Sequence, residues 1–137
     1  MSHQQLSTFL TEKFPQVAGD FSIETVAQDR LCVRLHVGDR NLRPGGTVSG
    51  PSMFALADVA MYLAILSRIG PQALVVTTNC SIDFMRKPAA GCDLIGEARL
   101  LKLGRVLAVG DVMIRSLGCD CPVARASLTY SIPPAPD

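Results

Sequence analysis

The sequence predicts an α+β fold in which an antiparallel β-sheet wraps around one buried helix. A long apolar stretch, residues 51–66, has the length and composition of a buried helix. In most of the remaining chain, apolar and polar residues alternate as they do in half-buried strands. Short turns separate most of these strands, which favours antiparallel hairpins. At 137 residues the chain has room for a single domain, which we expect to span residues 1–137.

The N-terminal part of the chain predicts a short helix and a β-hairpin. Within residues 4–14 the apolar side chains recur at spacings of three and four, which indicates an amphipathic helix, and Pro15 should end it. From residue 21 the period changes to strict alternation. This pattern predicts strands at residues 21–25 and 31–37, joined by a turn near Asp29.

The segment before the apolar stretch predicts a long shaped loop. Residues 38–50 contain four glycines and one proline, and loops of that length in a compact domain are often functional. Pro51 suits the first turn of a helix, where its missing N–H costs nothing, and Ser49 or Gly50 suits the cap. The helix should therefore begin near Gly50 and stop at Gly70-Pro71.

Four more strands are predicted after the helix. In the first, residues 73–85, the even positions from Leu74 to Phe84 form the expected core face. The odd positions, among them Thr77, should face water or a partner. The other strands are predicted at residues 93–103, 106–117 and 123–132, with turns at 104–105 and 118–120.

Composition argues against several classes of partner. The net charge is +1 and no basic run is longer than Arg86-Lys87, so no broad nucleic-acid surface is expected. We expect no signal peptide and no apolar run of the ~20 residues that span a bilayer, hence no membrane partner and a cytoplasmic protein. The five cysteines lack paired metal-ligand spacing, which favours reduced thiols over disulfides or a metal site. No dinucleotide or P-loop motif occurs, and we expect no cofactor.

Asp58 is the one formal charge between Pro51 and Leu66, and this makes it the leading candidate for chemistry. A carboxylate buried without a partner costs several kcal/mol, so something should be gained by keeping it in a core helix. On a peripheral helix the same residue would be an ordinary solvent-facing acid. Since buried ionisable groups cluster at functional sites, we favour the functional interpretation.

A set of short motifs runs along the chain: Gly45 to Pro51, Leu56-Ala57-Asp58, Thr77-Thr78-Asn79, Asp83 to Pro88 and Gly104-Arg105. Together they resemble the hotdog-fold acyl-CoA thioesterases of the phenylacetate-pathway type, a group similar to PaaI and to 4-hydroxybenzoyl-CoA thioesterase. The likeness covers about residues 21–132, the expected core of the domain. It implies a long helix wrapped by a curved antiparallel sheet. It also implies homodimers, or homotetramers made of two dimers, with active sites at the subunit interface.

The resemblance assigns roles to residues of the helix and of the strand that follows it. It implies that Asp58 attacks the thioester or activates water, and that the Gly50 N–H polarises the thioester carbonyl. Physical reasoning agrees for Gly50, because unpaired amides and the positive end of a helix dipole favour an oxyanion. Thr77 aligns with a Ser or Thr that in some relatives comes from the partner subunit to hold the attacking water. Asn79, on the same strand face, is a further substrate-binding candidate, although both could simply be solvated.

The resemblance also implies a site for coenzyme A. Arg86, Lys87 and Arg105, the last beside Gly104, lie where relatives often bind its phosphates, and Arg and Lys suit such groups. The alternative is that they are ordinary charges at strand ends.

The chain departs from the family's pattern near the start of the helix. Ser49-Gly50-Pro51 stands where relatives commonly have His-Gly-Gly, and Arg43-Pro44 stands where they have an Asn or Gln. Ser49 could donate a hydrogen bond to the thioester in place of the histidine. Asn41 could supply the missing amide, and Arg43 and Pro51 are further candidates for contact with the substrate.

The expected function is hydrolysis of an acyl-CoA thioester. The acyl pocket would be lined by Phe54, Met61, Tyr62 and Ile65, which suit a medium-chain or an aromatic acyl group. One alternative is a hydratase or dehydratase of acyl thioesters, which usually needs a His beside the acid. Another is an acyl-CoA binding module without catalysis. The carrier, coenzyme A or an acyl carrier protein, stays open.

Overall fold

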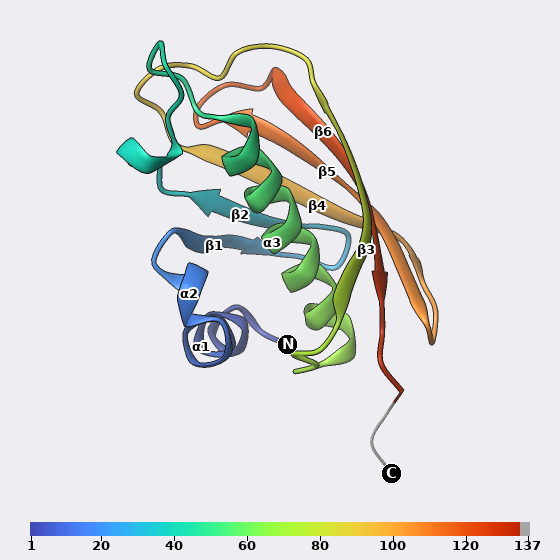
Figure 1. Cartoon of the computed structure of the whole chain (residues 1–137). Helices are drawn as coiled ribbons and strands as arrows, with labels where there is room; N and C mark the ends of the chain where they lie inside the picture. Colours follow the sequence, from blue (N-terminus) through green and yellow to red (C-terminus); the bar gives the residue numbers. More distant parts are fainter. Residues whose placement is uncertain (135–137) are drawn as a thin grey trace.

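A computed structural model describes residues 1–134 and shows a curved antiparallel sheet wrapped around one long helix, α3 (Gly50–Ile69) (Figure 1). This architecture confirms the predicted α+β fold. Strand order across the sheet is β1-β2-β4-β5-β6-β3, so β1 and β3 form its two edges. The strands are β1 (Phe21–Val26), β2 (Leu31–Leu35), β3 (Val76–Phe84), β4 (Leu94–Leu103), β5 (Leu107–Ser116) and β6 (Pro122–Ser131).

Helix α3 begins and ends at the positions that the sequence predicted. The Ser49 side chain caps it by accepting from the Ser52 N–H, and Pro51 occupies the first turn. The helix stops at Gly70, whose φ of 92° lies in the left-handed region that glycine enters without steric cost.

Glycines in the sheet let α3 approach β4 and β5 closely. A Cβ on Gly96 would lie 3.1 Å from the Leu56 Cγ. A Cβ on Gly110 would overlap the Met61 side chain and lie 2.6 Å from the Arg99 carbonyl oxygen. Leu56 and Met61 are therefore locked against the sheet. This packing fixes the rotation of α3 about its own axis. It therefore also fixes which way the side chains on the other faces of the helix point.

Helix α3 corrects one expectation about membranes. It has 20 residues and is long and apolar enough to cross a bilayer by length and composition, whereas no apolar run of that length was expected. In the structure it lies against the sheet (Figure 1), and 61% of its most apolar window is buried. Its position in the core accounts for its apolar composition.

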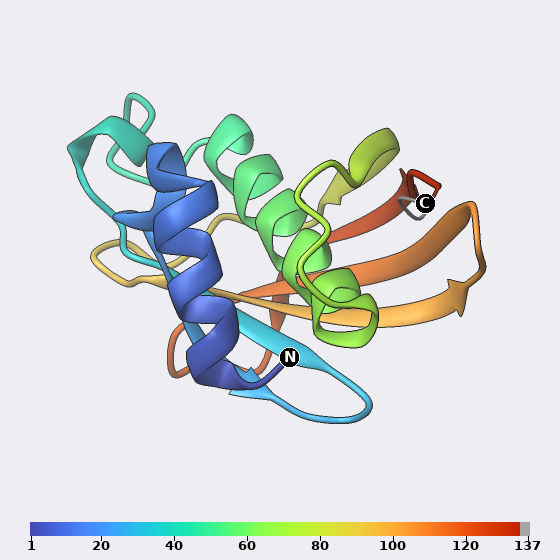
Figure 2. The same ribbon diagram turned by 90° about the horizontal axis from the view of Figure 1, so that it is seen from below.

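The N-terminal helix covers part of the same layer. Helix α1 (His3–Lys13) matches the predicted helix and starts with a capping box formed by Ser2 and Gln5. A second short helix that was not predicted, α2 (Pro15–Ala18), begins at the proline that ends the first. Figure 2 shows α1 beside α3. The buried residues of α1 are Leu6, Phe9 and Leu10.

The edge strand β3 is more exposed than its alternating pattern predicted. The expected core face should have been buried, but Val76 is 54% exposed and Phe84 is 52% exposed. Only Cys80 and Ile82 on that face are partly covered. Strand β3 pairs with β6 alone, through a register irregularity after Thr77, and its other edge has no partner within residues 1–134.

Candidate active site

Asp58 lies two turns into α3, where two hydroxyl groups meet its side chain. The Thr77 hydroxyl donates to Asp58 Oδ1 at 2.6 Å. The Tyr130 hydroxyl donates to the same Oδ1 and lies 2.7 Å from the Asp58 carbonyl oxygen. Within residues 1–134 no group donates to Oδ2. The two hydroxyls therefore hold one carboxylate oxygen and leave the other to meet a substrate or water.

The two hydroxyls come from neighbouring strands. Thr77 on β3 pairs in register with Tyr130 on β6, so both side chains reach the same point on α3. This geometry corrects the expectation that the partner subunit supplies Thr77, because the contact with Asp58 forms within one chain. Tyr130 was missed by the sequence reasoning. A tyrosine on the inward face of a strand is ordinary in a sequence, and only the pairing register reveals its partner.

The surroundings keep the hydroxyl of Tyr130 protonated. Burial, and then the negative charge of Asp58, raise the pKa of Tyr130 well above its ordinary value. The hydroxyl therefore remains a hydrogen-bond donor to the carboxylate. Burial and the charge of Asp58 also raise the pKa of the nearby Cys80 thiol, so this cysteine stays uncharged.

Asp58 opens into a pocket of about 460 Å³ between α3, the start of β3 and the link from α1 to α2. The Tyr62 hydroxyl donates to the Ala73 carbonyl oxygen at 3.1 Å, and the ring of Phe14 packs edge-on against the ring of Tyr62 at 6.0 Å. Burial raises the pKa of Tyr62. The walls around the carboxylate thus combine apolar and polar side chains. The other lining residues are Lys13, Gln16, Val59, Val75, Val76, Thr77 and Tyr130.

The start of α3 forms a second candidate half-site, separate from the one at Asp58. Pro51 has no N–H, the Ser52 N–H donates to Ser49 Oγ, and the Met53 N–H donates to the Ser49 carbonyl. Within residues 1–134 the Gly50 N–H has no acceptor. It is the unused donor of the first turn, at the positive end of the helix dipole.

A pocket of about 460 Å³ lies beside Gly50 and is rich in positive charge. Arg43, Arg86 and Lys87 line it, and the ring of Phe84 covers the glycine, with its Cζ 3.2 Å from the position of a Gly50 Cβ. Guanidinium and ammonium groups beside the unpaired Gly50 amide suit a ligand with several negative charges.

Asn41 and Ser49 have structural partners rather than open donors. The Asn41 side chain accepts from the Gly38 N–H at 2.8 Å and donates to Ser52 Oγ at 3.2 Å, and the residue is only 9% exposed. Ser49 is occupied by its cap interaction, and its hydroxyl donates to Ser52 at 3.1 Å. Both residues fix the loop of residues 38–50 onto the helix start. The structure therefore corrects the roles expected for them at the thioester.

The two half-sites do not meet within one chain. Gly50 and Asp58 are separated by eight residues of helix, about 12 Å along the axis at the usual helical rise. Their pockets share no lining residue. A single thioester carbonyl cannot contact the Gly50 N–H and the Asp58 carboxylate of the same chain.

Several expected binding residues lie elsewhere. Met61 and Ile65 are fully buried against the sheet and line neither pocket, so their assignment to the acyl pocket was wrong. Met61 and Ile65 follow Asp58 by three and seven residues, which predicts that they share its side of α3. The spacing does not show which side of the helix the sheet covers. Phe54 is 40% exposed, and like Pro51 and the exposed Asn79 it lies outside both pockets.

The basic residues also separate. Arg86 and Lys87 lie at the start of α3, whereas Arg105, after Gly104 in the β4–β5 turn, lines a different pocket beside Ile69 at the far end of the helix. One chain therefore does not gather the three cations into one phosphate site.

Comparison with known proteins agrees with this fold. The model of the thioesterase superfamily matches residues 45–123. A Pseudomonas aeruginosa protein named as a candidate esterase is 30% identical over 126 residues, which cover 91% of this chain and 92% of that protein.

Solved structures extend the likeness to the whole fold. A candidate thioesterase from Silicibacter sp. TM1040 is 59% identical with a TM-score of 0.91, over 98% of this chain and 93% of that one. The PaaI protein of the Escherichia coli phenylacetic acid degradation operon is 25% identical with a TM-score of 0.74, over 96% and 99% of the two chains. Because the family model covers more than half of the chain, this protein belongs to the thioesterase superfamily and is a thioester hydrolase.

Proposed function

We propose that this protein hydrolyses acyl-CoA thioesters of medium-chain or aromatic acids, with Asp58 as the catalytic carboxylate. The observation that carries the proposal is the arrangement around Asp58, in which Thr77 and Tyr130 both donate to Oδ1, Oδ2 has no donor within residues 1–134, and the residue lines a pocket. A carboxylate that is oriented by hydrogen bonds and partly shielded from water is a suitable base or nucleophile.

The proposed site is completed by a second copy of the chain. Two β3 edges that pair antiparallel about a two-fold axis would place the Thr77 end of one strand beside the Phe84 end of the other. Asp58 of one subunit would then approach the Gly50 amide of its partner. The exposed apolar side chains of β3 support such pairing, because a free apolar edge is otherwise an aggregation hazard.

Charge supports coenzyme A as the carrier. Arg43, Arg86 and Lys87 beside the helix start can bind its phosphates. A Streptococcus mutans protein of the same fold, 24% identical with a TM-score of 0.72, was crystallised bound to acetyl CoA. The fold therefore accommodates a coenzyme A thioester, and the basic pocket gives this chain a place for one.

The proposed chemistry uses only the chain's own groups and water. As a base, Asp58 Oδ2 takes a proton from water, and the oxygen of that water attacks the thioester carbonyl carbon. The partner's Gly50 N–H stabilises the oxyanion that forms. The carbon–sulfur bond then breaks, and the proton passes to the sulfur to give free coenzyme A and a carboxylic acid. As a nucleophile, Oδ2 would itself attack the carbonyl carbon, and the carbon–sulfur bond would break to release coenzyme A as its thiolate. Water would then hydrolyse the resulting anhydride, which frees the carboxylic acid, restores the Asp58 carboxylate and supplies the proton that the thiolate takes up.

The test is release of coenzyme A from short, medium, long and aromatic acyl-CoAs, measured by chromatography because five protein thiols would react with a thiol dye. Asp58→Asn should lower turnover by about a hundredfold or more, since it keeps the shape and removes the base. Asp29→Asn, in the exposed turn between β1 and β2, changes an aspartate that lines neither pocket and is the control. Full activity in Asp58→Asn would refute the assignment, and binding without release by the unmodified protein would favour a non-catalytic module.

A further inference from the structure

We propose that a groove between α1 and residues 71–73 binds the distal part of a linear acyl chain, so that of the two proposed substrate classes linear chains of medium or greater length are preferred to aromatic groups. The inference deepens the proposed function and rests on it, because it requires an acyl thioester at Asp58. The groove has a volume of about 690 Å³, larger than the pocket at Asp58.

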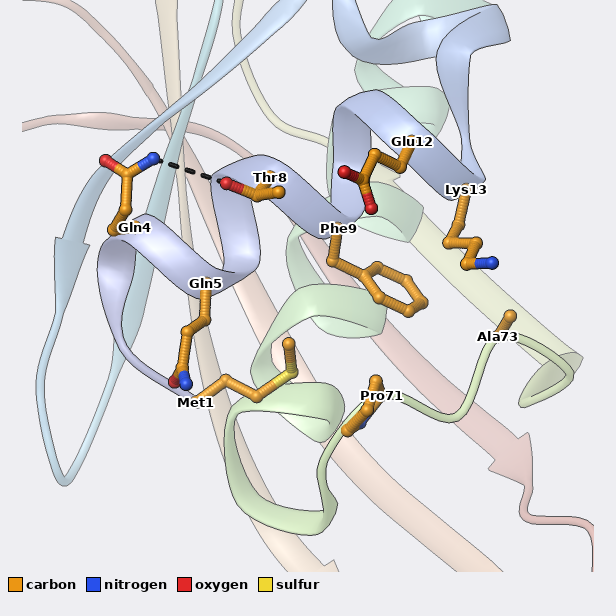
Figure 3. A pocket seen from close by; sticks show the side chains of 9 residues that line it. All are labelled: Met1, Gln4, Gln5, Thr8, Phe9, Glu12, Lys13, Pro71 and Ala73. Atoms are coloured by element: carbon orange, nitrogen blue, oxygen red, sulfur yellow. Dashed lines mark hydrogen bonds between the residues drawn. The ribbon is translucent and has the colours of Figure 1, made fainter.

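The groove is lined by apolar and polar side chains, and the Phe9 ring of α1 points across it toward Pro71 (Figure 3). Its apolar lining comes from both walls, α1 with the residue before it and the segment after α3. Such a lining suits hydrocarbon. The apolar lining residues are Met1, Phe9, Pro71 and Ala73, and the polar ones are Gln4, Gln5, Thr8, Glu12 and Lys13.

The groove continues from the proposed active site. Lys13 and Ala73 line both the groove and the pocket of Asp58. In Figure 3 these two residues lie at the same end of the groove, and Met1 and Gln5 lie at the other. The Tyr62 hydroxyl bonds the Ala73 carbonyl and so fixes the wall where the two spaces join. An acyl chain with its thioester at Asp58 can therefore run past Ala73 into the groove.

Charge distinguishes the acyl end from the coenzyme end of the substrate. Among residues 1–134, the charged side chains that line the groove are Glu12 and Lys13, which have opposite signs, and the Met1 amino group donates to the Ser67 carbonyl oxygen. The pocket at the helix start is lined instead by three cations and no anion. The cations therefore attract phosphates to the helix start. An uncharged hydrocarbon chain can occupy the groove without burying a charge. An aromatic acyl group would end within the Asp58 pocket and leave the groove unused.

Two threonines on α1 provide a matched test. Thr8 lines the groove, whereas Thr11, one turn further along the same helix, is also exposed and lines none of the pockets described. Thr8→Trp should fill the groove and raise the KM for dodecanoyl-CoA and palmitoyl-CoA about tenfold or more, with kcat nearly unchanged. The kinetics of acetyl-CoA and benzoyl-CoA should not change, and Thr11→Trp should behave as the unmodified protein.

The outcomes separate this inference from the proposed function. Hydrolysis of short or aromatic thioesters only, an unchanged KM for long chains in Thr8→Trp, or equal losses for all chain lengths would each overturn the groove assignment while the thioesterase stands. A lower oligomeric state in Thr8→Trp, measured by light scattering, would overturn it too by identifying the groove as a subunit contact. Absence of hydrolysis of any thioester by the unmodified protein would remove the proposed function and this inference together.

Discussion

At the scale of single residues, the two oxygens of Asp58 have different surroundings. Thr77 and Tyr130 both donate to Oδ1. These two hydrogen bonds fix the rotation of the carboxylate, so Oδ2 keeps one orientation. A reactive group held in one orientation avoids the cost of ordering at the moment of reaction. Tyr130 is 1% exposed and bonded also to the helix backbone, so in the proposed mechanism it is a positioning residue that acts through Asp58.

Tyr130→Phe tests this positioning. The ring still fills the core, but the carboxylate loses a buried donor, and we expect kcat to fall about tenfold because a hydrogen bond to a charged group contributes about 1.5 kcal/mol or more. KM should change little, since Tyr130 is 1% exposed and offers little surface to a substrate in the pocket. Steady-state kinetics over the acyl-CoA panel provide both values. An unchanged kcat in a folded variant would show that Tyr130 has only a packing role.

Residue-level prediction from the sequence was easiest where a side chain contrasts with its local context. Asp58 is conspicuous because its neighbours along the chain are apolar. Tyr130 is separated from it by 72 residues, and no local pattern marks their contact. Met61 was misplaced for the same reason, because helical spacing shows which residues share a side of α3 but not which side the sheet covers.

At the scale of elements, one carboxylate ties the end of β2 to the start of β4. Asp93 accepts from the Val37 N–H at 2.9 Å and from the Arg34 Nε at 2.8 Å. The Val37 bond, and then the nearby positive charge of Arg34, lower the pKa of Asp93 below its ordinary value of 3.8. The folded state therefore binds the proton at Asp93 more weakly than the unfolded state.

Asp93→Asn should lower the free energy of unfolding by about 1 kcal/mol at neutral pH, since it weakens charge-assisted hydrogen bonds at a partly exposed site. A lowered folded pKa contributes stability that is present above pH 3.8 and is lost as the pH falls through the folded value. The difference between the two proteins should therefore shrink below pH 3.8. Urea unfolding at several pH values measures it, and a difference that grows with acid would contradict the account.

Elements with strong local signals were predicted closely, and β3 was not. The cap at Ser49 and the stop at Gly70 depend on neighbouring residues, so the sequence alone locates the ends of α3. Burial of β3 depends on its place at the sheet edge, which alternation cannot reveal. The same alternating pattern is expected for a strand with one face buried in the core of its own chain and for an edge strand with that face exposed until a second chain covers it.

At the scale of the whole molecule, the exposed edge of β3 and the separation of the Asp58 and Gly50 half-sites have a common explanation. A dimer formed through β3, alone or within a tetramer, would cover its apolar side chains and join the Asp58 pocket of one subunit to the Gly50 pocket of the other. Oligomerisation would then be part of the catalytic apparatus.

Val76→Lys tests the assembly. Val76 is 54% exposed in the single chain, so a lysine there should cost a monomer little, whereas in a β3 interface it would bury charge and weaken the dimer. Leu117→Lys, in a half-exposed turn position between β5 and β6, is the control. Light scattering across protein concentrations should show dissociation of Val76→Lys at concentrations where the control and the unmodified protein remain assembled. Equal behaviour of all three would place the interface elsewhere.

The most direct test of the central claim, that Asp58 of one subunit works with the helix start of the other, is a mixing experiment. Asp58→Asn lacks the carboxylate, and the double variant Arg86→Glu with Lys87→Glu should lose the affinity of the basic pocket for coenzyme A. Each homodimer should be nearly inactive. After subunit exchange in equal amounts, about a quarter of the unmodified activity should return, because half of the dimers are mixed and each has one intact site. No gain despite proven exchange would show that each chain carries its own complete site.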